Sequence, residues 1–180
     1  MIFACYHGHI HIVNVLLENQ AGIDHADNNG KTSLIWAINK YKFEVAEELI
    51  RRGCNINIQS NKGLSALTYT CVTAQFDVIN LLLAEEGIEV DHVDKNGNTP
   101  IHYACAAIAK RPNPLIVEAL LEKGAPVHPV NVQGASSLHF AAVYDPYDEK
   151  YGKDPTDEDV ACIGISWGAN LEHSDNEGCV

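Results

Sequence analysis

The sequence predicts a mostly α-helical solenoid, in which helix-turn-helix units stack in a row and each unit projects a β-hairpin or turn. Three observations lead to this fold class: a repeat period close to 33 residues, apolar residues in the same register of each period, and glycines at fixed places between them. Divided by that period, the 180 residues give five units with incomplete ends.

Glycines mark the period most clearly. Pairs of glycines ten residues apart occur four times, and the second member of each pair, preceded by Gly30, recurs at steps of 33, 34, 37 and 44 residues. Glycine readily takes the left-handed conformation that ends a helix, and it is favoured in tight turns. We therefore expect the first glycine of each pair to end a helix and the second to close a turn. The pairs are Gly53 and Gly63, Gly87 and Gly97, Gly124 and Gly134, and Gly168 and Gly178.

The second helix of each unit is predicted from four apolar residues that share one helix face. They occupy offsets 0, 1, 4 and 5, which fit the period of an α-helix. A glycine follows each of these helices, except in the first unit, where Gln20 stands at that position. The four sets are Ile12, Val13, Leu16 and Leu17, then Val45, Ala46, Leu49 and Ile50, then Val78, Ile79, Leu82 and Leu83, then Ile116, Val117, Leu120 and Leu121.

A turn and a shorter first helix precede the second helix. Short β-prone stretches such as Ile56-Asn57-Ile58 run into turns such as Asp94-Lys95-Asn96-Gly97. Asp at the first position and Gly at the fourth favour a type I turn. The first helix is then expected after Thr99-Pro100, because proline is tolerated in the first turn of a helix.

The segment DKNGNTPIHYACA, residues 94–106, closely resembles the ankyrin repeat, whose first helix opens with a Thr-Pro-Leu-His segment. Residues 27–34 and 134–142 are similar, and Gly8-His9 followed by Ile12-Val13 matches the turn and second helix. The resemblance covers essentially the whole chain and implies an ankyrin-repeat α-solenoid. The repeats are expected at 1–26 (an incomplete start), 27–59, 60–93, 94–130 and 131–174, with a sixth beginning at 175–180.

Several units depart from the ankyrin pattern. Repeat 4 carries an insertion near 108–113, and repeat 5 carries one near 145–156. Gly164 stands where the second helix of repeat 5 is expected to have Leu, so we expect this repeat to be the least stable. Unit 1 presents apolar residues such as Phe3 and Val15, although terminal repeats normally carry polar caps. We therefore expect a segment of a longer array, or a truncated gene model.

Composition and charge argue against several classes of function. The chain is 46% hydrophobic, and its formal net charge is −12. A chain this acidic repels phosphate backbones, so we expect neither nucleic-acid nor anionic-membrane binding. No apolar run is long enough to predict membrane insertion, and the start lacks the basic region typical of a signal peptide. The six cysteines form no C-x-x-C pair, which favours a cytoplasmic location, with the nucleus left open.

Motifs for catalysis or metal binding are present only in part. Residues 164–168 match G-x-S-x-G around Ser166, but the order of the acid and histidine that follow does not fit the catalytic pattern. Gly30-Lys31-Thr32 lacks the earlier glycine of a phosphate-binding loop, and the three histidines within residues 7–11 have no further ligand at a metal-binding spacing. The acidic stretch 145–159 lacks the glycine of a calcium-binding loop. We therefore predict no enzyme activity, no cofactor and no metal site.

The ankyrin resemblance implies protein–protein recognition through the hairpin tips and the concave groove beside the first helices. The expected partner is therefore a protein, and the net charge of −12 favours faster association with a basic one. Variable residues at the predicted tips form the first candidate surface: Asn28, Asn29, Lys31, Asn61, Lys62, Leu64, Lys95, Asn96, Asn98, Val132 and Gln133.

An aromatic residue occupies the same position of the first helix in all five units. Two interpretations stay open: this aromatic column packs between repeats, or it lines the groove as a binding hot spot, where Trp and Tyr contribute much of the energy. The column consists of Phe3, Trp36, Tyr69, Tyr103 and Phe140, and its neighbours, expected to be more exposed, are Asn39, Lys40, Val72, Thr73, Ala106, Ala107, Val143 and Tyr144.

The resemblance also implies a modification site. Some hairpin asparagines of ankyrin repeats are hydroxylated when a Leu lies eight residues earlier, and Leu49 and Asn57 have this spacing.

Three classes of function are compared. The sequence favours a non-catalytic protein-interaction scaffold. The alternative is a regulatory or substrate-recruiting region of a larger enzyme, such as a kinase or a ubiquitin ligase. The third class, an enzyme in its own right, depends on Ser166 alone.

Overall fold

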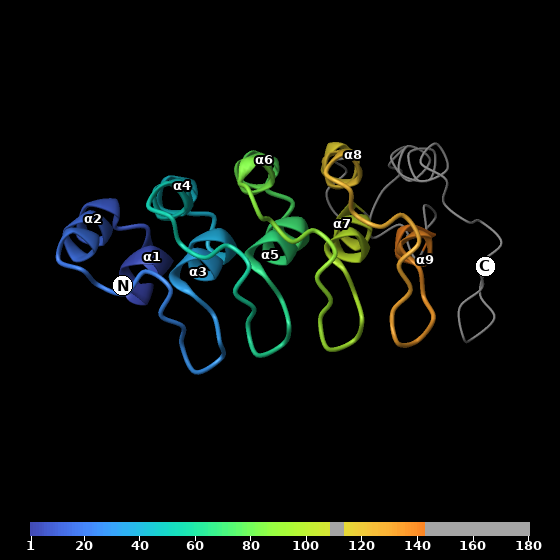
Figure 1. Ribbon diagram of the computed structural model, residues 1–180, viewed down its shortest axis with the longest axis horizontal. Helices are drawn as coiled ribbons and strands as arrows, with labels where there is room; N and C mark the ends of the chain where they lie inside the picture. The colour runs from blue at the N-terminus through green and yellow to red at the C-terminus, as the bar shows by residue number, and fades with distance from the viewer. Residues whose placement is uncertain (109–113, 143–180) are drawn as a thin grey trace, which may run out of the picture. The chain divides into compact units, whose positions relative to one another are not determined.

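The computed structural model describes residues 1–108 and 114–142, and in these residues nine helices follow one another without a strand (Figure 1). A short first helix is followed by a second helix, and a longer loop with a tight turn leads to the next pair. The helices are α1 (Ile2–His7), α2 (Ile10–Glu18), α3 (Ser33–Asn39), α4 (Phe43–Arg51), α5 (Ala66–Thr73), α6 (Phe76–Ala84), α7 (Pro100–Ile108), α8 (Leu115–Glu122) and α9 (Ser137–Ala142).

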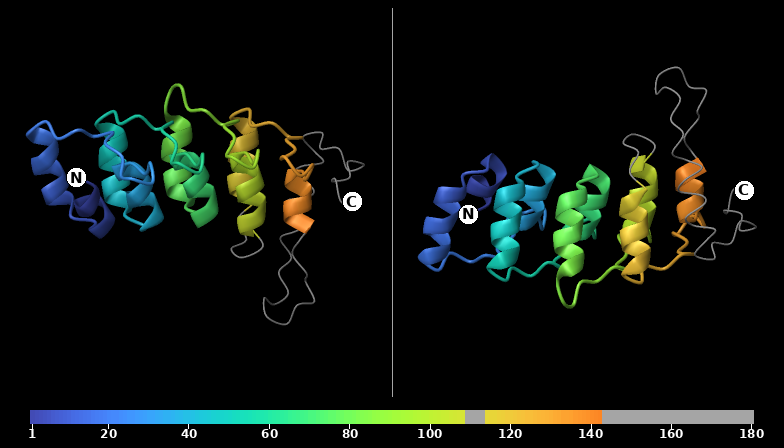
Figure 2. Two further views of the ribbon diagram at one scale, coloured as in Figure 1. Left: turned by 90° about the horizontal axis from the view of Figure 1, so that it is seen from below. Right: turned by 90° about the horizontal axis from the view of Figure 1, so that it is seen from above.

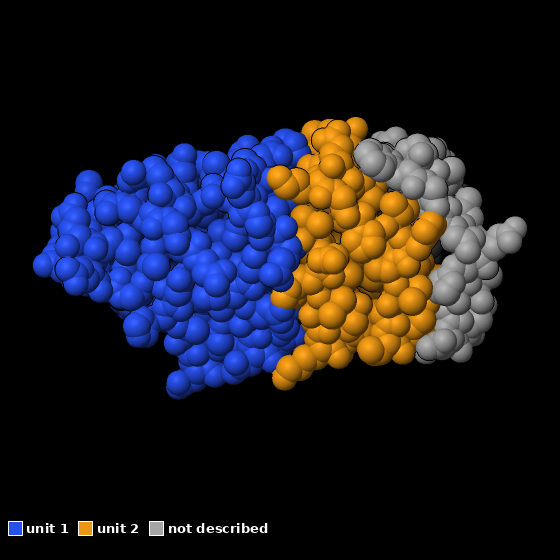
Figure 3. Space-filling view, in the orientation of Figure 1, with its two compact units in different colours: residues 1–89 blue, residues 90–180 orange. Residues whose placement is uncertain are grey.

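The chain divides into two compact units, residues 1–89 and residues 90–180, whose described residues Figure 3 shows in blue and in orange. Unit 1 contains α1 to α6, and unit 2 contains α7, α8 and α9. In unit 1 the first helices α1, α3 and α5 form one layer, and the second helices α2, α4 and α6 form another (Figures 1 and 2). Each helix of a layer packs against the next one in that layer, as expected for stacked helix-turn-helix units.

Hydroxyl side chains start two of the first helices. The Thr32 hydroxyl accepts a hydrogen bond from the Ile35 N–H (3.3 Å) at the start of α3, and the Ser65 hydroxyl accepts one from the Thr68 N–H (3.3 Å) at the start of α5. Each hydroxyl thereby satisfies a backbone donor that has no partner within the helix. These two units lack the proline of the ankyrin pattern, but they keep the residue that caps the helix.

The second helices end in left-handed backbone, as the glycine pattern predicted. Gly53, Gly87 and Gly124 have φ angles of 76°, 78° and 92°. In the first unit Gln20 takes the same conformation, with φ 62°. A side chain makes this conformation less favourable, so Gln20 fills the glycine position at an energetic cost.

The core follows the predicted apolar sets of the second helices. All four members of each set in α4, α6 and α8 are buried. In α2 only Val13 is buried, while Ile12 is 52% exposed. Within the described residues, α2 packs against one other second helix, α4. The opposite side of α2 therefore faces solvent, which explains the difference.

The β-prone stretches form turns rather than strands in the described residues. Isolated bridges pair Ala26 with Thr32 and Val130 with Ser136, each across a single turn. The turns themselves are as predicted: the Gly30 N–H donates to the Asp27 carbonyl at 2.9 Å, and the same bond recurs in the three later turns. A single bridge across each turn is too short a ladder to form a strand.

Some sequence predictions fall outside the described residues. They include the insertion of repeat 5 near 145–156, the beginning of a sixth repeat at 175–180, and most of the insertion near 108–113. The repeat boundaries therefore stay predictions. No helix in residues 1–108 or 114–142 is both long and apolar enough to cross a membrane.

Candidate functional site

The first turn of unit 1 is held by the carboxylate of Asp27. One carboxylate oxygen accepts the backbone N–H groups of Asn29 (2.8 Å) and Lys31 (2.9 Å), and the other accepts the indole N–H of Trp36 (3.0 Å). Desolvation acts to raise the pKa of Asp27, but these three donors outweigh it and hold the pKa below its ordinary value. The Trp36 ring is therefore fixed to the turn by its own polar atom.

Asp94 repeats this arrangement in unit 2. It accepts the Tyr103 hydroxyl at 2.5 Å and the backbone N–H groups of Asn96 and Asn98, each at 2.8 Å. Desolvation again acts to raise the pKa of Asp94, and the hydrogen bonds from Tyr103 and the turn lower it overall. The same ring position thus ties the first helix to the turn in two separate copies of the repeat.

Neighbouring turns are bonded to each other through backbone atoms. The Asn61 backbone N–H donates to the Asn29 carbonyl, and the Asn61 side-chain amide donates to the Asn28 carbonyl, both at 2.8 Å. The approach is so close that a Cβ at Gly30 would lie 2.6 Å from the side-chain oxygen of Asn61 and 2.7 Å from its backbone nitrogen. The tips of unit 1 are therefore one connected surface rather than independent loops.

The corresponding tips of unit 2 are also joined. The Val132 N–H donates to the Asn96 carbonyl at 2.9 Å, and the Asn131 amide donates to the Asn98 side-chain oxygen at 3.0 Å. Asn98 is buried by these contacts and by Asp94, so its side chain is part of the turn. Asn96, Val132 and Gln133 stay exposed.

Two lysines of unit 1 lie over aromatic rings. The Lys31 ammonium is 4.5 Å from the centre of the Trp36 ring and 5.1 Å from that of Tyr69, and the Lys40 ammonium is 4.6 Å from that of Tyr6. The Tyr6 and Trp36 rings are 5.3 Å apart. At these distances the quadrupole of each ring attracts the ammonium group. We call these five residues the lysine–aromatic face: Tyr6, Lys31, Trp36, Lys40 and Tyr69. The helices α1, α3 and α5 contribute the rings, the turn before α3 contributes Lys31, and Lys40 directly follows α3.

Exposure differs along the predicted aromatic column. Phe3 is 75% exposed and Tyr69 is 7% exposed, while Trp36, Tyr103 and Phe140 are half-buried. The Phe140 ring meets the edge of the buried His102 ring at 5.1 Å. The column therefore has no uniform environment, and both its packing and its binding role stay predictions.

The positions beside the column also differ from one another. Asn39, Lys40, Ala106 and Ala107 are half-buried, and Val72 is exposed. Thr73 was expected to be exposed but is buried, because its hydroxyl donates to the Tyr69 carbonyl at 2.8 Å within α5. Val143 and Tyr144 lie outside the described residues, as do Ser166 and the acidic stretch 145–159.

Asn57, the predicted hydroxylation site, joins two loops. Its side-chain amide donates to the Gly87 carbonyl at 2.7 Å, and its side-chain oxygen accepts the Glu89 N–H at 3.2 Å. Leu49, eight residues earlier, is fully buried in α4. Hydroxylation of Asn57 stays a prediction.

Buried polar groups in unit 2 hold the Thr-Pro-x-His segment. The His102 Nδ1 accepts the Thr99 backbone N–H at 3.1 Å, so its Nε2 carries the proton and donates to the Ala135 carbonyl at 3.2 Å. Burial lowers the pKa of His102. This histidine links the start of α7 to the loop before α9 and serves structure.

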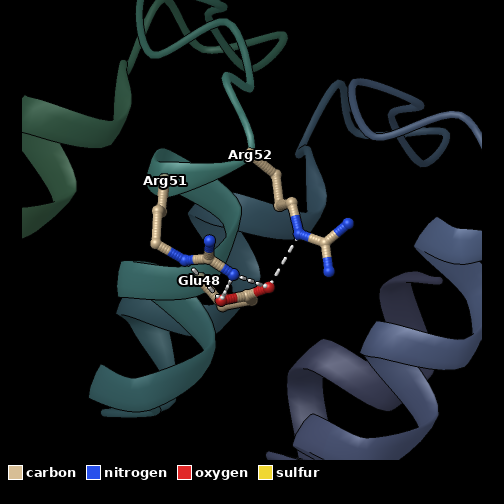
Figure 4. Close-up of polar contacts among 3 residues, drawn as sticks. All are labelled: Glu48, Arg51 and Arg52. Carbon is tan, nitrogen blue, oxygen red and sulfur yellow. Dashed lines mark hydrogen bonds and ion pairs between the residues drawn. The ribbon is translucent and has the colours of Figure 1, made fainter.

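Charges on the second helix α4 are paired with each other. The Glu48 carboxylate lies 2.6 Å from Arg51 and 2.8 Å from Arg52 (Figure 4). The hydrogen bond from Arg51 is the largest cause that lowers the pKa of Glu48. Within the described part of the chain, no three His, Cys, Asp or Glu side chains come close enough to hold a metal ion.

Cysteines in the described residues are buried. Desolvation raises the pKa of both Cys54 and Cys105 to about 12, so their thiols stay protonated near neutral pH. Cys5 and Cys71 are fully buried in the first helices α1 and α5, where they are small residues of the core.

Sequence reasoning missed three residues that organise this surface: Tyr6, Asp27 and Asp94. A signal for the aspartates was present, since each precedes the aromatic position by nine residues, where the other two turns have Ser60 and Asn131. Tyr6 lies three residues after the column, at the position of Asn39 and Val72, and nothing in its repeat position singles it out.

Helix pairs joined by hydrogen-bonded turns define a helical repeat protein of the solenoid class. A family model described as ankyrin repeats, in three copies, matches residues 1–60 and 37–125. The chain belongs to the ankyrin repeat family.

Similar proteins are much longer than this chain. Protein glp-1 of Caenorhabditis elegans is 26% identical over 90% of this chain and 12% of its own length. Human transient receptor potential cation channel subfamily A member 1 is 28% identical over 76% of this chain and 12% of its length. Human ankyrin repeat and KH domain-containing protein 1 is 31% identical over 56% of this chain and 4% of its length. The chain thus spans about an eighth or less of each of these relatives.

Proposed function

We propose that this chain is a non-catalytic scaffold that binds a protein partner through its turn tips and the groove side of its first helices. Ankyrin repeats are general protein–protein interaction modules. The observation that carries the proposal is the lysine–aromatic face, in which Lys31, Lys40, Tyr6 and Trp36 are held in place while they stay partly exposed. Surfaces that are ordered before binding lose little conformational entropy on association.

The binding surface can be tested with substitutions that differ in their expected effect on the fold. Phe3→Ala removes a ring that is 75% exposed, so we expect little change in stability. Trp36→Ala removes the bond to Asp27 as well, so it is expected to reduce both stability and binding. Affinity purification with the full chain, followed by mass spectrometry, supplies the partner, and its affinity for each variant is then measured by calorimetry.

Phe3→Ala and Lys40→Gln are expected to weaken binding of the partner and to leave the midpoint of thermal unfolding unchanged. Ile12→Ala is the matched control, because Ile12 is exposed on the second helix α2. A partner that binds Phe3→Ala and Lys40→Gln as tightly as it binds the wild type would contradict this surface.

A regulatory or substrate-recruiting role within a larger protein is the second candidate. It is supported by the small share of each relative that the chain spans. The full open reading frame of the gene tests it, since an adjoining kinase or ubiquitin-ligase domain would favour this role over a scaffold.

We further propose a cytoplasmic location. The reduced thiols of Cys5, Cys54 and Cys105 support it, because disulfides are typical of oxidising compartments. Fluorescence microscopy of the tagged native protein tests the location.

A further inference from the structure

Within the described helices, acidic side chains occur only in second helices. Their carboxylates number one in α2, three in α4, one in α6 and two in α8, all of them second helices. The first helices α1, α3, α5, α7 and α9 carry none. The net charge of the chain therefore misrepresents the surface that the first helices present. These carboxylates are Glu18, Glu44, Glu47, Glu48, Asp77, Glu118 and Glu122.

Cations on the first-helix side of unit 1 are not neutralised by ion pairs. Both ion pairs in the described part of the chain belong to Glu48, so neither Lys31 nor Lys40 forms one there. Asp27 is close enough to Lys31 to interact electrostatically, but three N–H donors already occupy its two oxygens. The ammonium groups instead lie over the rings of Tyr6, Trp36 and Tyr69.

An ammonium group over a ring keeps its hydrogen-bond donors available. The ring attracts the cation without accepting its N–H groups in the way a carboxylate does, so a ligand oxygen can still bind. The ring contact also restricts the long lysine side chain, which reduces the entropy lost on binding. Lys31 and Lys40 are therefore positioned for carboxylates supplied by another molecule.

We propose that the lysine–aromatic face of unit 1 binds an acidic segment of a protein partner, with its Asp or Glu carboxylates bound by Lys31 and Lys40. This inference rests on the proposed function and specifies the chemistry of the partner. It reverses the preference for a basic partner that the net charge of −12 indicates. The net charge acts at long range, whereas contacts at the face depend on the charges that lie there.

Salt concentration separates these two effects. Near ~0.15 M salt the Debye length is about 8 Å, so carboxylates farther away on the second helices are largely screened. At lower salt their repulsion extends further and opposes an acidic ligand. The comparison of ligands therefore belongs at the higher salt concentration.

The test uses three fluorescein-labelled peptides of equal length, with glutamate, lysine or glutamine at the same positions. Each is titrated with the full chain and binding is followed by fluorescence anisotropy. The glutamate peptide is expected to bind more tightly than the other two. Lys31→Gln and Lys40→Gln are each expected to lower the affinity for the glutamate peptide roughly twofold to fivefold, as for one partly exposed ion pair.

Lys123→Gln is the matched control. Lys123 is exposed at the end of α8 in unit 2, so its substitution removes the same charge from a place outside the face. A second measurement locates the ligand: with Trp167→Phe as background, Trp36 is the one remaining tryptophan, and its emission should change on binding. Equal weakening by Lys123→Gln, or no change in Trp36 emission, would overturn the inference.

The outcomes also separate this inference from the proposed function. If the glutamine or lysine peptide binds as tightly as the glutamate peptide and loses affinity in Lys40→Gln, the acid preference is wrong and the binding face stands. If no peptide binds and the purified partner is insensitive to the same variants, both are wrong. An oligothymidylate that displaces the glutamate peptide with equal affinity would show a preference for anions in general and overturn the assignment to an acidic protein segment.

Discussion

At the scale of single residues, the aromatic residues at one repeat position differ in their contacts and exposure. Trp36 and Tyr103 donate to the aspartate of their turn, whereas Tyr69 is nearly buried and Phe3 is largely exposed. Each difference has a local cause, such as the presence or absence of an aspartate nine residues earlier. The local surroundings of each ring, and not its repeat position alone, therefore set its contacts and exposure.

The hydroxyl of Tyr103 is expected to contribute to stability. Tyr103→Phe keeps the ring and removes the hydrogen bond to the Asp94 carboxylate, at a cost of roughly 1.5–3 kcal/mol. Tyr69→Phe is the matched control, with an expected change under about 0.5 kcal/mol. Urea unfolding followed by circular dichroism measures both, and equal costs would contradict the role assigned to Asp94.

His102 is expected to make stability depend on pH. Its pKa lies below the ordinary value of 6.5 because the side chain is buried, so the unfolded chain takes up a proton first. The stability that neutral His102 contributes is present above 6.5 and is lost as the pH falls toward the lower pKa of the folded state. The loss is on the order of 1 kcal/mol for each pH unit in this window.

The contribution of His102 is isolated by comparison with His102→Gln. The variant should be less stable at neutral pH, and its unfolding free energy should fall less steeply between about pH 7 and pH 5.5. Urea unfolding at a series of pH values measures the slope. Parallel curves for the two proteins would show that His102 does not titrate in this window.

At the scale of elements, the turns are hydrogen-bonded to one another as well as to their own helices. Asn61 bonds to the carbonyls of Asn28 and Asn29, and the close approach leaves no room for a side chain at Gly30. The helix end at Gly53 has the same left-handed backbone, but a Cβ there would meet nothing within 4 Å. The two glycines therefore differ in packing alone.

Gly30→Ala is expected to be more destabilising than Gly53→Ala. Both substitutions place alanine in left-handed backbone, at about 1–2 kcal/mol each. At Gly30 the new Cβ also displaces Asn61, which adds roughly 1 kcal/mol for the lost turn-to-turn hydrogen bond. Thermal unfolding of the two variants measures the difference, and equal midpoints would mean that the turns separate at little cost.

Sequence periodicity predicted the buried faces of three second helices well. The apolar sets of α4, α6 and α8 are buried as a group, and three glycines end second helices as expected. The set in α2 is only partly buried, because burial depends on what packs against a helix and not on its own sequence. The expected hairpin strands were too short to form a ladder.

At the scale of the whole molecule, charge differs between first and second helices in a way that composition hides. The net charge of −12 describes the sum, while the described first helices carry no carboxylate. The lysine–aromatic face could not be predicted from the repeat. The path of a long side chain such as Lys31 or Lys40 depends on which ring lies within its reach in three dimensions.

Added salt is expected to stabilise the chain. Like charges that crowd the folded state repel one another, and mobile ions screen this repulsion. We expect the midpoint of thermal unfolding to rise between ~0.01 M and ~0.15 M sodium chloride, where the Debye length falls from about 30 Å to about 8 Å. A midpoint that falls instead would mean that attractive pairs such as Glu48 with Arg51 outweigh the repulsion.

The contact between the turns has a consequence for how this surface can change over generations. Asn61 donates hydrogen bonds to the backbone carbonyls of Asn28 and Asn29, whose side chains are exposed to solvent. Because this contact uses backbone atoms, the fold does not depend on which side chains stand at positions 28 and 29, provided the backbone conformation is kept. Mutation, or a designed library, can therefore change the tips to bind a new target while the fold beneath them is preserved.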